Sequence, residues 1–391
     1  MSTQTPVVAL PPSSVLFGDV RLPKLRVLAN GMPIAGVVSA EVTSNNHYAA
    51  DRFRVDIATS ADPSMGPAFW AGTASIVIDV QVSVQPAPVA AAATSWQSLA
   101  QGQVDLVDID MVSRIARLEG RDFTAALIEA RTQETFANRT SSEIATILAQ
   151  RHGLTPQVTQ TTTPVGQYYQ LEHDRITLDQ FSRSTTEWDL LINLAQHEGF
   201  DVFVQGTTLV FAPPTQQPDN PIVLRPVTTV TGPANILDLR VERSLTLARD
   251  IEVTVKSWNT KQQNAFTQTA RASGQNGSAT PSSTGPAQRY VFVRPNLTMD
   301  EALKLAQSKL AELTRHERTI IAAMPGELSL TPRSIVILEG TVTSFDQSYY
   351  VDEIERSISI GSGFTQRIVA RNIQSGHQST TPADTVGAVT G

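Results

Sequence analysis

The sequence HEGFD, from His197 to Asp201, has residue types that could bind a metal ion. Metalloproteases carry His-Glu-x-x-His on one helix, where residues at positions i and i+4 share a face. Here Gly199 falls between the two outer positions, and the residues that follow have strand character. We therefore expect the helix to end inside the motif. His197 and Glu198 are then solvated residues of a last helical turn, and Asp201 lies on the polar side of a strand.

Glu172, His173 and Asp174 form a second polar cluster, just before the sequence RITLDQF. Such a cluster could hold a metal ion or transfer a proton, but it is more often a turn at a helix start. Glu187 and Asp189 follow nearby in the sequence. The carboxylates could therefore also form an acidic interaction surface, or act as the acid and base of a hydrolase.

The remaining candidates for chemistry have structural interpretations. His152 and His316 stand at the predicted ends of helices, where a positive charge suits the helix dipole. The chain has no cysteine and no GxxxxGK[ST], GxGxxG or GxSxG motif. Trp188 begins an apolar helical segment and is expected in a core. We predict no catalytic, cofactor-binding or metal-binding residue, and hence no enzyme.

The composition indicates packed globular domains. Of 391 residues, 41% are hydrophobic and 17% are charged, which suits cores in roughly two to four domains. The formal net charge of −7 disfavours phosphate binding, so we expect no sequence-specific binding of nucleic acid. The first positive charge is Arg21 and no apolar run is long enough to cross a bilayer. We therefore expect neither a secretory signal nor a membrane anchor.

Residues 1–115 are predicted to form a small antiparallel β domain. Asn30-Gly31 stands between two apolar runs, which is a strong hairpin signal. Apolar residues then alternate with polar ones from Phe53 to Ile57 and from Ile76 to Val84, as in half-buried strands.

Residues 116–235 are predicted to form a mixed α/β domain with two helices and a hairpin. Thr140 and Glu143 have the spacing of a capping box ahead of an apolar stripe. A second helix is expected from about Thr186 to His197. The sequence FDVFVQGTTLVFA that follows predicts the hairpin.

Residues 236–258 and 317–375 are predicted to form a second β domain, because alternating apolar residues return in both segments. The interruption, residues 259–316, is predicted to be a flexible excursion followed by a helix from Met299 to Arg315. Residues 259–288 contain no Leu, Ile or Val and therefore cannot bury much apolar surface.

Residues 376–391 are expected to be a loose tail. The predicted fold class is α+β and mainly β, with an antiparallel β domain towards each end and a mixed α/β domain inserted between them.

The order of the motifs resembles phage baseplate hub proteins, also called tail proteins of the late-control gene D family. The segment LEGRDFTAALIEARTQETFANRTSSEIATILAQRHGL carries the G-R-D/E-x-T turn of the family at Gly120. It continues with a phenylalanine, Phe136, a T-x-x-E-I helix at Thr140 and a G-L stop at Gly153. The stretch from Asp189 to Val204 is similar to the family's helix-to-hairpin segment.

A late segment, AAMPGELSLTPRSIVILEG, is similar to the closing β domain of that family. One departure is Pro332-Arg333, which stands where many relatives have Pro-Gly. The matching motifs are short, and together they cover most of residues 20–375.

The resemblance implies a structural part. Hubs of this family, which are related to the N-terminal hub part of type VI secretion spike proteins, are trimers in the baseplates of contractile or related tails. Each chain contributes two tube-like β-barrel domains, so three chains make a pseudo-sixfold ring. This symmetry adaptor joins the sixfold tail tube to a threefold central spike.

The partners implied are two further copies, the tail tube protein and the central spike protein, with tape measure and baseplate wedge proteins as further neighbours. The implied location is the virion, in the phage tail baseplate, after assembly in the host cytoplasm. The family carries over no catalytic residue.

Two alternatives stay open at the level of the sequence. The chain could be a cell-wall hydrolase or a carbohydrate-binding tail component that uses carboxylates near Glu172 or Asp189. It could also be the hub of a phage-derived injection system or of a gene-transfer particle.

Overall fold

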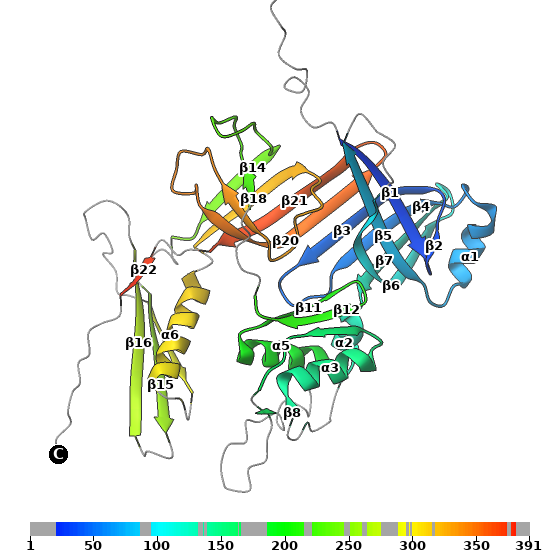
Figure 1. The fold of residues 1–391 in the computed structure, drawn as a ribbon. Helices are drawn as coiled ribbons and strands as arrows, with labels where there is room; N and C mark the ends of the chain where they lie inside the picture. Colours follow the sequence, from blue (N-terminus) through cyan, green and yellow to red (C-terminus); the bar gives the residue numbers. More distant parts are fainter. Residues whose placement is uncertain are drawn as a thin grey trace, which may run out of the picture. The chain divides into compact units, whose positions relative to one another are not determined.

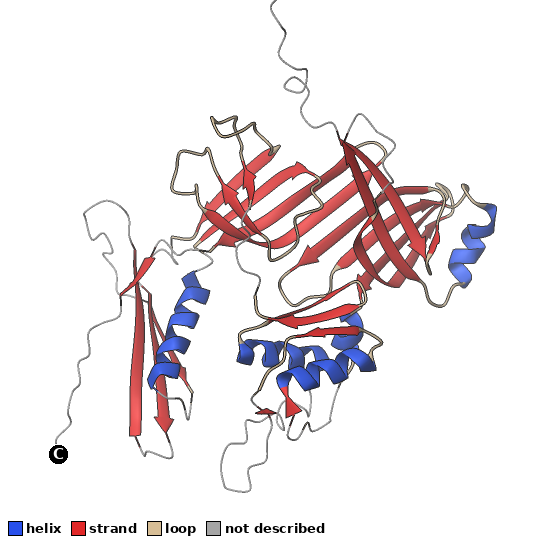
Figure 2. Ribbon diagram, in the orientation of Figure 1, coloured by secondary structure: helices blue, strands red, loops and turns tan. Residues whose placement is uncertain are grey.

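A computed structural model shows a mainly β chain with separate helices, which confirms the predicted fold class at that level (Figures 1 and 2). The structure describes residues 21–86, 95–131, 136, 139–162, 164–165, 186–214, 221–245, 251–259, 264–274, 288–294, 297, 299–314, 317–373 and 377–380. The chain divides into two compact units. Unit 1 comprises residues 1–214, 326–329 and 355–365, and unit 2 comprises the remainder.

Unit 1 is built on a sheet with the strand order β3-β4-β7-β6-β5-β1-β2, in which neighbouring strands are antiparallel. The strands are β1 (Arg21–Ala29), β2 (Met32–Pro33), β3 (Val37–Asn45), β4 (Arg52–Ala58), β5 (Val77–Pro86), β6 (Gln97–Asp110) and β7 (Ile115–Asp122). A 3₁₀ turn, η2 (Pro63–Met65), and a short helix, α1 (Pro67–Gly72), connect β4 to β5. Asn30 and Gly31 form the predicted turn between β1 and β2.

The predicted period of two explains how this sheet buries one face. Val55 and Ile57 on β4 and Ile78 and Val80 on β5 are buried in one apolar core, while the residues between them are polar or more exposed. Burying these side chains is the main favourable term for the sheet, at about 25 cal/mol for each Å² of apolar surface removed from water.

Gly120, the glycine of the G-R-D sequence, lies on β7 where two strands and a ring approach closely. A Cβ atom there would lie 2.2 Å from the carbonyl oxygen of Gln103 and 2.4 Å from Cζ of Phe53. No side chain fits in that space, so only glycine allows this packing.

The rest of unit 1 is the predicted mixed α/β part (Figure 1). Its elements are α2 (Thr124–Glu129), β8 (Arg139–Thr140), α3 (Ser141–Arg151), β9 (Thr155–Val158), β10 (Pro164–Val165), α5 (Glu187–Glu198), β11 (Asp201–Gln205) and β12 (Thr208–Ala212). The capping box of Thr140 and Glu143 is confirmed at the start of α3. Strand β12 pairs with β11 in the predicted hairpin and also with β9 in parallel. The apolar faces of α3 and α5 share a core with β11 and β12.

Unit 2 contains a second apolar core. It is formed by β13 (Ile222–Leu224), β14 (Asp238–Arg243), β18 (Arg318–Pro325), β19 (Ile335–Leu338), β20 (Ser348–Ser359) and β21 (Gly363–Asn372). The strand order runs β14-β18-β21-β20, and β19 pairs with both β20 and β13. Residues 215–235 were expected with the mixed α/β domain. Instead they contribute β13 to unit 2, because the parallel pairing of β13 with β19 buries Leu224.

Unit 2 also holds a small sheet with one helix, in the order β17-β15-β16-β22. The elements are β15 (Ile251–Asn259), β16 (Asn264–Gly274), β17 (Gln288–Val293), β22 (His377–Thr380) and α6 (Met299–Thr314). Helix α6 buries Ala302, Ala306 and Leu310 against this sheet.

The segment expected to be a flexible excursion differs in the structure. Asn264–Gly274 is a strand that pairs with β15 from Asn264 to Ala272 and with β22 from Arg271 to Gly274, so its backbone hydrogen bonds are met by neighbouring strands. Residues 260–263 and 275–287 of that segment lie outside the described residues. The same holds for residues 376 and 381–391 of the expected tail, whereas His377–Thr380 forms β22.

Two further expectations concern turns and closure. Arg333, which stands where many relatives of the resembled family have glycine, adopts a φ of 79°, a conformation that glycine reaches at lower cost. The hydrogen-bonded order of the described strands begins at β14 and ends at β2, and these two strands are not paired with each other. No closed barrel is found among the described strands. The two tube-like barrels therefore stay a prediction.

The hairpin of β20 and β21 contributes buried residues to both apolar cores. Ile354 and Ile368 belong to the core of unit 2, and Ile358 and Phe364 belong to the core of unit 1. The buried residue between the two isoleucines of β20 is Arg356. The corresponding buried residue of β21, between Phe364 and Ile368, is Gln366.

Replacing Gln366 by methionine should stabilise the protein. Both polar atoms of its buried amide lack a hydrogen-bond partner among the described residues, and such a group costs about 1–3 kcal/mol. We expect Gln366→Met to raise the free energy of unfolding by about 1 kcal/mol in denaturant titrations. Gln347→Met is the matched control, because the Gln347 amide donates to the Tyr349 hydroxyl at 3.2 Å. An equal gain in the control would contradict the explanation.

Candidate interaction surfaces

The HEGFD stretch does not assemble a helical metal site. Helix α5 ends at Glu198, and Gly199 follows with a left-handed φ of 70°, so the predicted break is confirmed. His197 is exposed, and Asp201 is the first residue of β11. Glu198 differs from the expectation of a merely solvated residue, because it accepts a hydrogen bond from the Ser141 hydroxyl at 2.6 Å. Within the described part of the chain, no group of three His, Asp or Glu residues could hold a metal ion.

The carboxylates considered as an acidic surface have structural roles where they are described. Glu187 is buried, and its two oxygens lie 2.5 Å from Arg151 Nη1 and 2.5 Å from His152 Nε2. Asp189 accepts a hydrogen bond from the Thr186 backbone in the capping box of α5. The acidic-surface interpretation is therefore wrong for Glu187. Glu172, His173 and Asp174 lie outside the described residues.

The described tryptophans have separate local surroundings. Trp188 is buried as predicted, and its indole N–H donates to the Tyr48 carbonyl at 2.6 Å. Trp96 stacks on the Arg26 guanidinium, whereas Trp258 is half-exposed on β15 of unit 2. His152 is the C-terminal cap of α3, as its position predicts. His316 lies outside the described residues.

Asp122 is a buried carboxyl that the sequence analysis did not identify. Burial, together with the negative charge of Asp51, raises the pKa of Asp122 to about 8, although Thr124 donates hydrogen bonds that oppose the shift. A single acidic residue at the end of a strand gives no signal of this in the sequence. The carboxyl is therefore largely protonated at neutral pH.

Strand β14 offers an open sheet edge in unit 2, since it is the terminal strand of its sheet among those described. The Ser244 N–H donates to the Glu317 carbonyl. In an antiparallel pair, every second residue of a strand points its N–H and C=O groups towards the partner strand. Glu242 and Arg240 therefore also point their backbone groups towards β18. The N–H and C=O groups of Val241 then point away from β18. This edge is a template for pairing with another strand.

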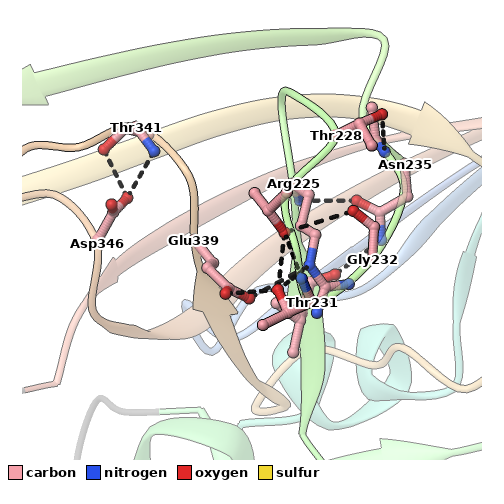
Figure 3. A network of polar contacts seen from close by, with 11 residues as sticks. Arg225, Thr228, Thr231, Gly232, Asn235, Glu339, Thr341 and Asp346 are labelled. Carbon is pink, nitrogen blue, oxygen red and sulfur yellow. Dashed lines mark hydrogen bonds and ion pairs between the residues drawn. The ribbon is translucent and has the colours of Figure 1, made fainter.

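Two loops of unit 2, residues 225–235 and 339–346, are joined by a polar network (Figure 3). Arg225 Nε lies 3.2 Å from Glu339 Oε2, and the Thr231 hydroxyl donates to Glu339 Oε1 at 2.6 Å. The Arg225 side chain is largely buried, which makes this ion pair stronger than one at an open surface. The network fixes the two loops against each other.

The fixed loops expose three valines, which we call the valine surface: Val227, Val230 and Val342. Val230 is fully exposed and Val342 is 93% exposed. Val342 also has a φ of 54°, which is unfavourable for a β-branched residue. Its N–H donates to Asp346 at 2.9 Å, and that carboxylate also accepts from Thr341 (Figure 3). Strained residues often cluster at functional sites, so Val342 is a candidate for such a site.

A hollow of about 440 Å³ lies in unit 1 beside the Trp70 ring. The Trp70 indole N–H is buried and has no hydrogen-bond partner among the described residues. The acidic residue of the hollow, Asp105, is paired with Arg121 at 2.7 Å. We call this site the Trp70 hollow; its lining residues are Trp70, Ala71, Thr73, Ala74, Val104, Asp105, Val107 and Ile109.

Comparisons with solved structures identify the fold, which is that of phage tail proteins. The chain is similar to the tail protein from Neisseria meningitidis MC58, with 16% identity and a TM-score of 0.62. That match covers 90% of this chain and 96% of the Neisseria chain. It is also similar to the 43 kDa tail protein of prophage MuSo2 from Shewanella oneidensis, with 15% identity, a TM-score of 0.61 and coverage of 91% and 100%. A chain of the Francisella PdpA-VgrG complex matches at 8% identity with a TM-score of 0.51, over 94% of this chain and 60% of that one.

The chain belongs to the Alg8 N-terminal domain family, whose profile matches residues 107–359. That family name neither supports nor contradicts the late-control gene D resemblance, which stays a prediction. No curated protein matches the chain. None of the helices in the described residues is long and apolar enough to cross a bilayer.

Asp122→Asn should remove a pH dependence of stability. The folded-state pKa of about 8 exceeds the ordinary value of 3.8, so the folded chain keeps a proton that the unfolded chain loses as the pH rises between these values. Stability therefore falls by up to about 1.4 kcal/mol per pH unit across that window. We expect the variant to gain roughly 2 kcal/mol or more over wild type at pH 8 and little at pH 4, in denaturant titrations. Asp108→Asn, at an exposed carboxylate, should show no such difference.

Val342→Gly should stabilise the folded chain. Glycine adopts positive φ without a Cβ clash, so the free energy of unfolding should rise by roughly 0.5–1 kcal/mol. Val230→Gly is the matched control, because Val230 is as exposed but does not have a positive φ. It should lose roughly 0.5–1 kcal/mol through the greater freedom of the unfolded chain. A loss for both variants in thermal unfolding would contradict the strain.

Proposed function

We propose that the chain is a structural hub of a phage tail or of a related particle. In this role three copies form a pseudo-sixfold ring that joins the tail tube to a central spike. The observation that supports this most is the fold shared with two tail proteins over at least 90% of each chain compared.

The arrangement of the cores supports the ring. A threefold object that caps a sixfold tube needs two similar β modules in each chain. This chain has two separate β cores, one in each unit, and they share one hairpin. The open edge of β14 is a hazard on a monomer, and pairing with another chain in a ring would remove it.

The proposed role includes no catalysis, cofactor or metal. Asp189 is occupied as a helix cap and Glu187 as a buried ion-pair partner, so neither carboxylate favours the hydrolase alternative. The hub of an injection system or of a gene-transfer particle would use the same surfaces. The genes that neighbour this one distinguish those settings.

The partners in this proposal are two further copies, a tail tube protein and a central spike protein, with tape measure and baseplate wedge proteins nearby. The location is the tail baseplate of a virion, after assembly in the host cytoplasm. The match to a chain of the PdpA-VgrG complex supports assembly with other proteins.

The purified chain should form trimers. We expect light scattering to give about three times the 42.2 kDa of one chain, and electron microscopy to show rings with a central channel. A protein that stays monomeric up to about 0.1 mM would count against the hub, since an obligate interface buries roughly 2,000 Å² or more and is tight.

Val241→Pro tests the open edge of β14. Proline there removes an N–H that points away from β18, so the fold should keep its stability within about 0.5 kcal/mol. Pairing with another chain should weaken, so the trimer of the variant should dissociate at a higher protein concentration than the wild-type trimer does. Glu242→Pro is the control, because it removes an N–H that points towards β18 and should lower stability by about 1 kcal/mol or more. Unchanged trimers with Val241→Pro would exclude this edge from the assembly.

A further inference from the structure

Strand β17 is an open edge of the small sheet in unit 2. It pairs with β15 on one side and is the terminal strand of that sheet among the described strands. The Arg294 N–H donates to the Lys256 carbonyl at 3.0 Å, so Phe292, two residues earlier, also points its backbone groups towards β15. The N–H and C=O groups of Val291 and Val293 then point away from the sheet.

The same two valines also expose their side chains. Helix α6 packs on one face of the sheet, and Val291 and Val293 lie on the other face, where they are 55% and 73% exposed. On the helix side, Tyr290 and Phe292 are only partly buried. A strand added beside β17 would bond to the open backbone groups and remove apolar surface on both faces from water.

Proline does not block this edge as it blocks the edge of β1 in unit 1. The Ile34 N–H donates to the Val27 carbonyl on the side of β1 that faces away from β5. Pro23 lies four residues before Val27, so its nitrogen points to that side and has no hydrogen to donate. Strand β17, Gln288–Val293, contains no proline, so each outward-facing residue offers both a donor and an acceptor.

The charges at β17 indicate the chemistry of an occupant. Arg289 and Arg294 stand on either side of a four-residue stretch that contains both valines, and residues 288–294 contain no acidic residue. The Arg289 side chain is 73% exposed, and its ion-pair partner Glu252, at 3.6 Å, is largely buried. Lys256 is exposed on the face of the valines. A segment with an apolar centre and acidic ends complements this edge.

We propose that β17 binds an extended segment of a partner protein as an added strand, and that this segment has an apolar centre and acidic ends. Its backbone pairs with Val291 and Val293, and its apolar side chains lie beside theirs. Its acidic residues lie beside Arg289 and Arg294. Single-stranded nucleic acid would meet the cations but not the alternating donors and acceptors of a strand edge, so the chemistry favours a polypeptide. The inference stands apart from the proposed hub, which it does not require.

A peptide probe tests the edge. Fluorescein-labelled Glu-Thr-Val-Thr-Val-Glu is titrated with the full chain at low salt, and fluorescence anisotropy gives the Kd. We expect saturable binding that is at least tenfold tighter than that of Lys-Thr-Val-Thr-Val-Lys, because the second peptide places cations against the two arginines. Equal binding of both peptides, or no binding of the acidic peptide at about 0.5 mM protein, would overturn the proposal.

Val291→Pro locates the peptide on the edge. Proline there removes an N–H that points away from β15, so the chain should stay folded while the Kd for the acidic peptide rises about tenfold. Phe292→Pro is the control for the assignment of the edge, since it removes an N–H that points towards β15 and should lower the free energy of unfolding. A folded Val291→Pro variant with unchanged peptide affinity would refute strand addition.

Arg294→Glu tests the charge without any change in backbone pairing. The acidic peptide should bind about fivefold or more weakly, and the lysine peptide more tightly. Lys304→Glu, at an exposed position of α6, is the matched control for net charge and should change neither affinity more than about twofold. A loss of affinity as large in the control would refute the role of Arg294.

Two other occupants would be recognised in the same experiments. An oligodeoxythymidine that displaces the acidic peptide and binds Val291→Pro as tightly as wild type would assign the surface to nucleic acid. A lower molecular mass of Val291→Pro in light scattering would assign the edge to another copy of the chain. Either result would overturn the proposed partner, whereas a wild-type chain that is monomeric and binds the acidic peptide would overturn only the hub.

Discussion

The hairpin of β20 and β21 is the constraint on which the two β cores depend. Ile354 and Ile358 lie on one strand, four residues apart, and yet are buried in different cores. A shift of one residue in the pairing of this hairpin would turn its side chains to the opposite face, and both cores would lose buried residues. Arg356 lies between them and is buried. Burial lowers the pKa of Arg356 to about 10, while the negative charges of Asp51 and Glu327 favour its charged form. Buried polar groups therefore stand where the apolar residues of the hairpin change from one core to the other.

Most residues that could have done chemistry serve the fold. Glu187 ties the end of α3 to the start of α5 through Arg151 and His152, and Glu198 is held by Ser141. A buried carboxylate that depends on an arginine and a histidine is stable only while both stay in place, so this cluster fixes how the helices meet. The same residue types would make a catalytic site elsewhere. Here their hydrogen-bonding capacity is used inside the protein.

Two features of unit 2 cost stability in an isolated chain. The edge of β14 has unpaired backbone groups, and Val342 combines a positive φ with an exposed apolar side chain. The edge of β14 becomes favourable if a second chain supplies a strand. Asp122 differs from these, because its raised pKa is a property of burial inside unit 1.

The sequence by itself determined the local elements. Alternation of apolar residues predicts the strands around Val55 and Ile78, the spacing of Thr140 and Glu143 predicts a helix start, and Gly199 predicts the helix end inside HEGFD, because each signal acts within a few residues. Only the tertiary structure decided that polar Asn264–Gly274 is a strand, that residues 222–224 join unit 2, and that Glu187 is buried. Those outcomes depend on pairing and packing between residues far apart in the chain. A local sequence pattern cannot predict the energy of such contacts, because that energy depends on residues outside the pattern.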